Sequence, residues 1–210
     1  MTFSSVYEMT NPLTTVRKQK FWDYFSGSIL KEGWTIAYSS GNITNQPNGI
    51  EDAVDGGWYM QTHNANTSAY VQIDHANKYQ FNAIASAYIA VAKVNSTSGI
   101  SMYIGLHEDS HMQTFIGSEQ IYYKFDTRNN LVGSTSTNTT VAMDTSWHTH
   151  KGETNGIVAH NWIDGVLEAS VTSTLPSTAA GDLEPFMQIG NVGSGASFKG
   201  SVRYFECWNT

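Results

Sequence analysis

Cysteine is almost absent from this chain. Cys207 is the only one among 210 residues. A single thiol cannot form an intramolecular disulfide or supply the several thiolates of a cysteine-rich zinc site. Cys207 lies in an alternating apolar segment, which predicts a structural side chain rather than a reactive one. Disulfide-stapled scaffolds and cysteine-rich zinc domains are therefore excluded.

Positive charge and long apolar runs are scarce as well. Charged residues make up 14% of the chain, and the net charge is −7. No basic patch exists to displace the counterions of a nucleic acid, so no nucleic-acid partner is expected. No apolar run reaches the length of a membrane-spanning helix, and the first twenty residues lack the apolar core of a signal peptide. We expect no membrane insertion, and an extracellular, cell-surface or virion location reached without a visible signal peptide.

The residues that are abundant predict strands and turns. Ser, Thr, Asn and Gly are frequent, and aromatic residues reach 12%. Residues 70–74 alternate strictly between apolar and polar, as a half-buried strand does. Residues 158–171 form two short apolar-rich runs around Asp164-Gly165, a pair that suits a type I′ hairpin turn because both of its central positions need positive φ. About twelve to fourteen such strands predict an all-β fold, an antiparallel two-sheet β-sandwich of the jelly-roll type.

The chain reads as one domain with a lead-in. Residues 1–20 are polar and weakly patterned, which predicts an N-terminal arm, and residues 21–210 form the single jelly-roll domain. The longest apolar run, residues 81–94, is rich in β-branched and aromatic residues and favours a long central strand over a helix. Trp22, Trp34 and Trp208 are expected in the core.

Three motifs together resemble those of concanavalin A-like (laminin G-like) jelly-roll domains. They are Phe21-x-Asp23-x-Phe25-x-Gly27 with Trp34, Trp147-His148 with Trp162-Ile163-Asp164-Gly165-Val166, and the final strands at residues 185–191 and 202–208. The resemblance spans residues 21–208. It implies the jelly-roll fold and a possible structural calcium at Asp23 and Asp164, although the turn alone also explains Asp164. The family includes lectins, adhesion domains, glycosidases, lyases and virus surface proteins, so the resemblance leaves the function open.

A literal HExxH motif occupies residues 107–111. In zinc peptidases the two histidines share one face of a helix and bind zinc, and the glutamate acts as general base. Here the motif lies between predicted strands, so we expect a polar loop and no zinc. Three other histidines form a second candidate site, because His148 and His150 share a strand face and His160 lies on a neighbouring strand. They suit a metal site, a catalytic base, or a plain surface or cleft lining.

An enzyme is the less favoured interpretation. Glycosidases with this fold carry an E-x-D-x-E strand, and no such triplet occurs here. A lyase needs a Tyr/His acid–base pair with Arg or an amide to neutralise a uronate. The residues available for that role are Tyr122, Tyr123, His148 and Arg128.

Glycan binding is the favoured interpretation, because sugar rings stack on aromatic side chains that lie beside polar groups. The candidate ligand-binding residues are Trp58, Tyr59, Tyr70, Tyr88, Tyr103, Tyr122, Trp162, His148 and His150. The sequence thus favours a non-catalytic carbohydrate-binding or adhesive module with a glycan or polysaccharide as partner. A structural subunit of a virion or appendage, self-assembling as a homo-oligomer through its arm, is the first alternative. A polysaccharide-degrading enzyme, lyase-like or a glycosidase, is the second.

Overall fold

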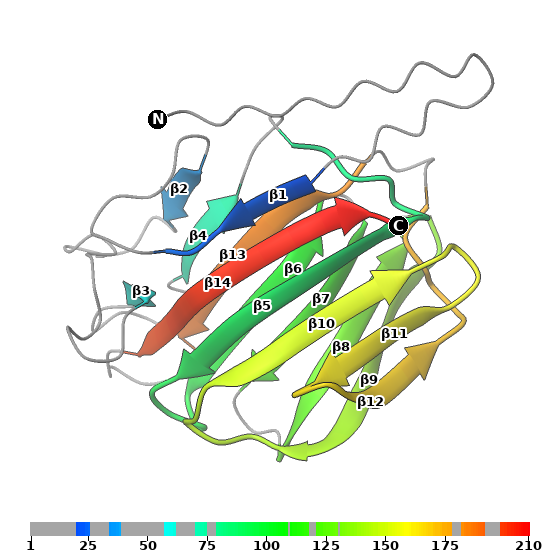
Figure 1. Cartoon of the computed structure of the whole chain (residues 1–210). Coiled ribbons are helices and arrows are strands. Elements are labelled where there is room, and N and C mark those ends of the chain that lie inside the picture. The colour runs from blue at the N-terminus through cyan, green and yellow to red at the C-terminus, as the bar shows by residue number, and fades with distance from the viewer. Residues whose placement is uncertain are drawn as a thin grey trace.

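Fourteen strands make up the fold of the part of the chain that the structure describes (Figure 1). The computed structural model describes residues 20–25, 34–38, 57–61, 70–74, 79–108, 110–117, 121–129, 131–177, 182–191 and 198–210. For residues 36–38, 70–74, 116–117 and 191 it describes the backbone alone. Within these ranges there is no helix, and so none that is long and apolar enough to cross a membrane.

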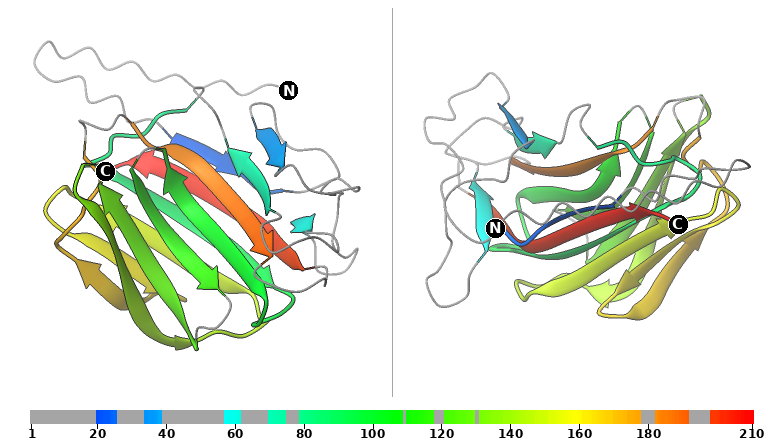
Figure 2. Two further views of the ribbon diagram at one scale, coloured as in Figure 1. Left: turned by 180° about the vertical axis from the view of Figure 1, so that it is seen from behind. Right: turned by 45° about the horizontal axis from the view of Figure 1, so that its top comes forward.

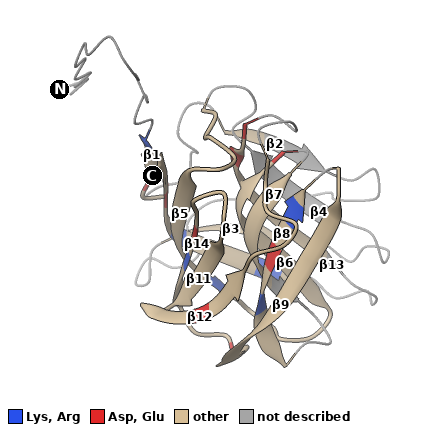
Figure 3. Cartoon of the chain, turned by 90° about the vertical axis from the view of Figure 1, so that its right-hand side faces the viewer, with Lys and Arg blue, Asp and Glu red and all other residues tan. Residues whose placement is uncertain are grey.

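The strands form two seven-stranded sheets that pack face to face (Figures 1, 2 and 3). Sheet A has the order β1 (Lys20–Asp23), β14 (Lys199–Asn209), β5 (Ser86–Val94), β10 (His148–Thr154), β11 (Ala159–Ile163) and β12 (Val166–Val171), and β3 (Trp58–Gln61) also pairs with β14. Sheet B has the order β2 (Thr35–Tyr38), β4 (Tyr70–Asp74), β13 (Glu184–Asn191), β6 (Ile100–His107), β7 (His111–Gly117), β8 (Tyr122–Asn129) and β9 (Gly133–Ala142). The predicted antiparallel two-sheet sandwich is confirmed.

Alternation along each strand divides the side chains between the core and the surface. On β6, Met102, Ile104 and Leu106 point into the sandwich and are fully buried. On β5, Tyr88, Ala90 and Ala92 meet them from the other sheet. Successive side chains of a strand point to opposite faces, so the intervening residues line the two outer surfaces.

A polar contact joins the two sheets inside this core. The Tyr88 hydroxyl on sheet A lies 2.8 Å from Thr114 Oγ1 on sheet B, and Asn161 Nδ2 donates to the same oxygen at 3.1 Å. Asn161 Nδ2 also donates to the carbonyl of Lys151 at 3.0 Å. All three side chains are buried, and buried polar groups are stable only when they are hydrogen-bonded. This contact holds the two sheets in one relative position.

The predicted hairpin is confirmed. Asp164 has φ 51° and Gly165 has φ 82°, the two positive values that a type I′ turn requires. Ile163 and Val166 pair on either side of the turn, and β11 and β12 run antiparallel from it.

Some expectations need correction or lie outside the described residues. Trp22 is 46% exposed, because Phe21 and Asp23 occupy the inward positions of β1. The prediction of a core Trp22 is therefore wrong. Trp34 packs partly buried against the core, and Trp208 is half-buried. Of the predicted arm, only Lys20 is described, and it begins β1, so the arm stays a prediction.

Gly152 provides a test of the packing between the sheets. A Cβ at this position would lie 2.3 Å from Cε1 of the buried Tyr88 ring. The Gly152→Ala variant is expected to lose about 3 kcal/mol of unfolding free energy, because Tyr88 cannot move without breaking its bond to Thr114. Urea denaturation measures this loss. Val166→Ala at an exposed position serves as the control and should stay within about 0.5 kcal/mol of the wild type; equal stability of the two variants would contradict the prediction.

Candidate active site

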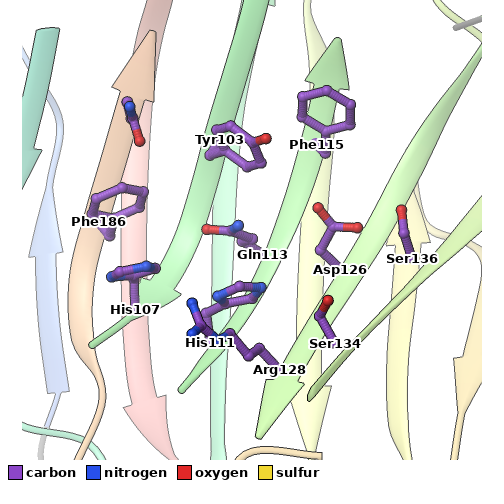
Figure 4. Close-up of a pocket in the computed structure, with 11 residues that line it drawn as sticks. Tyr103, His107, His111, Gln113, Phe115, Asp126, Arg128, Ser134, Ser136 and Phe186 are labelled. Atoms are coloured by element: carbon purple, nitrogen blue, oxygen red, sulfur yellow. The ribbon is translucent and has the colours of Figure 1, made fainter. Parts of the chain in front are cut away.

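A pocket of about 580 Å³ lies on the outer face of sheet B (Figure 4). Five neighbouring strands contribute to it: β13, β6, β7, β8 and β9. The inward residues of these strands fill the core, so alternation leaves their partners to line the pocket. The lining residues are Tyr103, His107, His111, Gln113, Phe115, Asp126, Arg128, Ser134, Ser136, Phe186 and Gln188.

The strand register arranges these side chains in three transverse rows. The aromatic row runs Gln188–Tyr103–Phe115. The middle row runs Phe186–Gly105–Gln113–Asp126–Ser136. The histidine row runs His107–His111–Arg128–Ser134. Directly opposed residues on paired strands are close neighbours, so each row is a continuous line of side chains.

Gly105 occupies the middle row, between the aromatic and histidine rows. It lies between Tyr103 and His107 along β6, and between Phe186 and Gln113 across the sheet. Its φ is 156°, and a Cβ there would lie 2.5 Å from the Met112 carbonyl oxygen. No other residue type fits this position without displacing β7. Glycine at this position lets β7 approach β6 closely in the middle row.

The HExxH motif is a hairpin of two strands. His107 ends β6, His111 begins β7, and the two residues oppose each other directly. Their rings stack with centroids 5.4 Å apart, and Glu108 N donates to the Ser110 carbonyl at 2.8 Å to close the turn. The zinc-peptidase geometry, which needs both histidines on one helix face, does not exist here. The expected polar loop is limited to the turn, and both histidines line the pocket instead.

Burial controls the protonation of the titratable residues in the pocket. Burial, together with the nearby His107 and Arg128, lowers the pKa of His111 to about 3. His111 is therefore a neutral imidazole at ordinary pH, able to accept a proton. Burial and the charge of Asp126 raise the pKa of Tyr103, so that its phenol keeps its proton.

Three buried polar atoms at the pocket have no hydrogen-bond partner among the described residues. They are His111 Nδ1, Gln113 Oε1 and Asp126 Oδ1. Gln113 is only 4% exposed. Burial raises the pKa of Asp126, while a hydrogen bond from Ser136 and the charge of Lys124 partly oppose the shift. Unpartnered buried polar groups are costly and cluster at functional sites, and here they occur on neighbouring positions of β7 and β8.

The aromatic row forms a stacking surface beside these polar atoms. Tyr103 and Phe115 lie with ring centroids 4.7 Å apart and an interplanar angle of 27°. His107 stacks on Phe186 at 4.4 Å on the other side of the pocket. Flat apolar faces next to amide, imidazole and guanidinium groups match the chemistry of a sugar-binding site.

Of the candidate ligand-binding residues whose side chains the structure describes, only Tyr103 lies in this pocket. Trp58 and Tyr88 are buried in the core, and Tyr122 is 40% exposed at the start of β8. Tyr59 and Trp162 face outward from sheet A, where Lys199 and Lys151 lie over their rings. Tyr70 begins β4, of which only the backbone is described.

The four candidate lyase residues are not brought together. Tyr123 is buried between the sheets, with its ring 5.4 Å from that of His148 and 5.2 Å from that of His150. Arg128 points to the opposite, outer face of sheet B, as the alternation of β8 requires. The three histidines do not form one site either, because His160 faces outward from sheet A and bonds Ser170 Oγ at 2.8 Å.

His148 is held between two carboxylates. Its Nδ1 lies 2.6 Å from Asp164 Oδ2, and its Nε2 lies 3.0 Å from Asp144 Oδ1. Asp164 Oδ1 also accepts from Thr149 N at 2.8 Å. Burial lowers the pKa of His148, but the bonds to Asp164 and Asp144 outweigh burial, and the pKa is raised overall. This site stabilises the β11–β12 hairpin and is separate from the pocket.

The calcium prediction stays a prediction. Asp23 Oδ1 accepts from Phe25 N at 3.0 Å, and its Oδ2 accepts from Trp34 Nε1 at 2.9 Å. Asp23 and Asp164 lie toward opposite edges of sheet A, so they cannot share one ion. Across the described ranges, no three His, Cys, Asp or Glu side chains are grouped as metal ligands.

Sequence reasoning had pointed to several residues of the pocket and missed others. It named Tyr103 and Arg128, and it noticed His107 and His111 for another chemistry. Gln113, Phe115, Asp126, Phe186 and Gln188 were missed. A signal existed in the i, i+2 spacing of His111, Gln113 and Phe115, which places them on one strand face once β7 is known.

Comparisons with known proteins identify the fold. No protein-family model and no curated protein matches the sequence. Among solved structures, a Bacillus licheniformis β-glucanase matches with a TM-score of 0.66 and 14% identity, over 91% of this chain and 98% of that one. The catalytic domain of an endo-1,3-β-glucanase (laminarinase) from Thermotoga petrophila RKU-1 has a TM-score of 0.68 and 9% identity, over 91% and 98%. A β-1,3-glucanase from Mycobacterium marinum has a TM-score of 0.62 and 16% identity, over 90% and 97%.

At these identities the likeness shows the fold alone. The chain has the jelly-roll sandwich of the β-glucanases, which confirms the predicted concanavalin A-like fold; the laminin G-like assignment stays a prediction. The comparisons also correct the favoured interpretation of the function. A non-catalytic carbohydrate-binding or adhesive module is contradicted, because the solved structures that this chain resembles include glucanases and a glycosyl hydrolase family protein.

The His148 site predicts a pH-dependent contribution to stability. An unfolded histidine has a pKa of about 6.5, and the folded pKa of His148 lies higher. The stability from its charge is therefore fully present below about pH 6.5 and lost as the pH rises through the folded pKa. The His148→Gln variant should lose about 1 kcal/mol of stability relative to the wild type at about pH 6, and much less at about pH 9.

Chemical denaturation at the two pH values measures this difference. The neighbouring His150 has its pKa lowered by burial to about 3 and stays neutral over this range. The non-titrating Leu131→Ala, at an exposed position of the β8–β9 turn, serves as the control and should show one stability difference at both pH values. A His148→Gln difference that does not change with pH would contradict the prediction.

Proposed function

We propose that this protein is a polysaccharide-degrading enzyme that acts in the pocket above Gly105. The structural neighbours support this proposal, because their printed names are those of enzymes that cleave glucan chains on the same fold. The observation that carries it is the pocket itself. Arg128, a neutral His111 and the unpartnered Gln113 and Asp126 oxygens meet beside an aromatic stacking surface.

The positions of the acidic residues favour elimination over hydrolysis. Retaining glycosidases hold two carboxyl groups about 5–5.5 Å apart, and inverting enzymes hold them about 6.5–9.5 Å apart. On the described outer face of sheet B, Asp126 lines the pocket on β8, and Glu184 shares the face of Phe186 on β13. These strands are three inter-strand steps apart, which is about 14 Å at the usual strand spacing. At this backbone separation the two carboxyl groups do not form the close pair of a retaining glycosidase.

A uronate-containing chain suits the cationic side of the pocket. Arg128 offers a planar donor that pairs with a carboxylate. Gln113, one row away, offers an amide to the same sugar. Neutralising the uronate carboxylate makes the proton on its C5 more acidic, and this step is the one that elimination requires. A polymer of this kind fits the predicted extracellular or cell-surface location, which stays a prediction.

The proton transfers are assigned to His111 and Tyr103. The neutral imidazole of His111 removes the C5 proton, the C4=C5 double bond forms, and the C4–O bond breaks. Tyr103 gives its phenolic proton to the departing oxygen, so that the product is a chain with an unsaturated end. A bound uronate beside His111 raises the pKa of the imidazole, which makes it a stronger base in the complex than in the free protein. Tyr103 and His111 lie on neighbouring strands with the middle row between them, and strand geometry places their Cα atoms about 14 Å apart. A sugar bound over the middle row lies between the two long side chains, which together with the sugar must span this distance.

Removing the phenol tests the assignment of Tyr103. The Tyr103→Phe variant keeps the ring that stacks on Phe115 and loses only the proton donor. Its kcat on a polyuronate is expected to fall about 100-fold or more, because a positioned general acid contributes on that order. The measurement follows the ultraviolet absorbance of the C4=C5 double bond conjugated with the carboxylate.

Matched variants separate this role from folding and from binding. Tyr59→Phe makes the same change on sheet A and should keep full activity. Arg128→Ala should raise KM for a polyuronate as well as lower kcat, since it removes the charge partner of the carboxylate. New reducing ends without unsaturated ends would show hydrolysis and overturn elimination. No cleavage of either charged or neutral polysaccharides would overturn the proposed function itself.

A further inference from the structure

The outer face of sheet A carries a transverse row with a tryptophan toward each end. The strand register aligns Trp22, Glu206, Ile89, Lys151, Trp162 and Leu167 in this order. None of these residues belongs to the pocket, which lies on the other sheet. We call this row the platform.

Exposed aromatic rings gather at the β1 end of the platform. Trp22 is 46% exposed and Tyr24 is 62% exposed, with ring centroids 5.5 Å apart. Tyr24 in turn lies 4.9 Å from Tyr204 of β14. Glu206 bonds the Tyr204 hydroxyl and pairs with Lys20 Nζ at 2.5 Å, so the cluster has a cation at its edge. These rings are held in place by neighbours and yet remain open to solvent.

A second aromatic position with its own cation lies four strands away. Lys151 Nζ is 4.2 Å from the centroid of the Trp162 ring, and Leu167 beside it is 51% exposed. The strands that separate Trp22 from Trp162 place the two positions about 19 Å apart. The residues between them are Glu206 and the half-buried Ile89, which are not a continuous apolar surface.

We propose that the platform is a second binding surface of this enzyme, for the same anionic polysaccharide that enters the pocket. The proposal takes its substrate class from the proposed function. Exposed aromatic faces such as those of Trp22 and Tyr24 stack on sugar rings. Because sheet A and sheet B face opposite ways, the platform holds a stretch of polymer apart from the stretch that is cleaved. It raises the local concentration of substrate around the pocket.

The form of the platform favours a polysaccharide over a protein partner. Protein interfaces place their apolar residues in one central patch surrounded by polar residues. Here the rings lie toward the ends and the centre is charged, since Glu206 pairs with Lys20, and Lys151 pairs with Glu153 at 2.7 Å. An extended, repeating ligand touches separated positions of this kind equally well.

Retardation in gels that contain polyuronate tests the proposal on the whole chain. The double variant Trp22→Ala/Tyr24→Ala should bind a long polyuronate on the order of tenfold more weakly, because it removes two exposed stacking faces. The single variant Trp162→Ala tests the other position and should weaken binding in the same direction. The matched control is Leu131→Ala, a still more exposed apolar residue at the β8–β9 turn, which should migrate as the wild type does.

A pocket variant, a neutral polysaccharide and sedimentation separate binding at the platform from the alternatives. Arg128→Ala impairs the pocket and should keep the binding that depends on the platform. This measurement needs no cleavage, so its result is independent of whether the proposed reaction occurs. Unchanged retardation in both platform variants, with folding verified by thermal melting, would overturn the proposal. Equal retardation in a neutral glucan would overturn its anionic specificity. Loss of self-association in sedimentation, without a change in retardation, would show that the surface joins copies of this chain instead.

Discussion

The alternation of side chains along the strands, combined with antiparallel register, is the constraint on which the rest of the structure depends. On β6 it sends Met102, Ile104 and Leu106 into the core and leaves Tyr103 and His107 outside. Pairing with β7 and β13 then lines up the outward residues in rows. The packing of the core therefore decides which side chains line the pocket. The inter-sheet contact of Tyr88 and Thr114 fixes which residues face inward, because a shift of either strand by one residue would expose it.

The fold was predictable because it rests on local signals that repeat along the chain. Asp164-Gly165 specifies its turn, and the strand at residues 70–74 follows from alternation alone. The strand β9 was not predicted beyond its opening turn, since Gly133–Ala142 reads GSTSTNTTVA and lacks an apolar period. It pairs through its backbone along β8, and its outward Ser134 and Ser136 need no apolar character. A polar edge strand can be recognised only after the strand that it pairs with is known.

The pocket was less predictable, because its residues come from five strands and meet only through register. Gln113 and Asp126 oppose each other on β7 and β8, although thirteen positions separate them in the chain. No spacing rule finds such a pair before the sheet is known. Trp22 shows the complementary error. Large aromatic residues are usually buried, but Trp22 occupies an outward position between two buried neighbours. The position of a residue in the alternation, more than its type, decides whether its side chain is buried.

The HExxH motif shows how secondary structure decides what a set of residues can do. On a helix, residues i and i+4 converge on one ion; across this hairpin, His107 and His111 instead stack with parallel ring planes. Burial, together with His107 and Arg128, keeps His111 uncharged at ordinary pH, so that a neutral imidazole lines the pocket. The five-residue motif that binds a metal on a helix here supplies a neutral imidazole and a pair of stacked rings. The arrangement of the pocket therefore follows from sheet geometry rather than from the motif, and the proposed proton abstraction depends on this geometry.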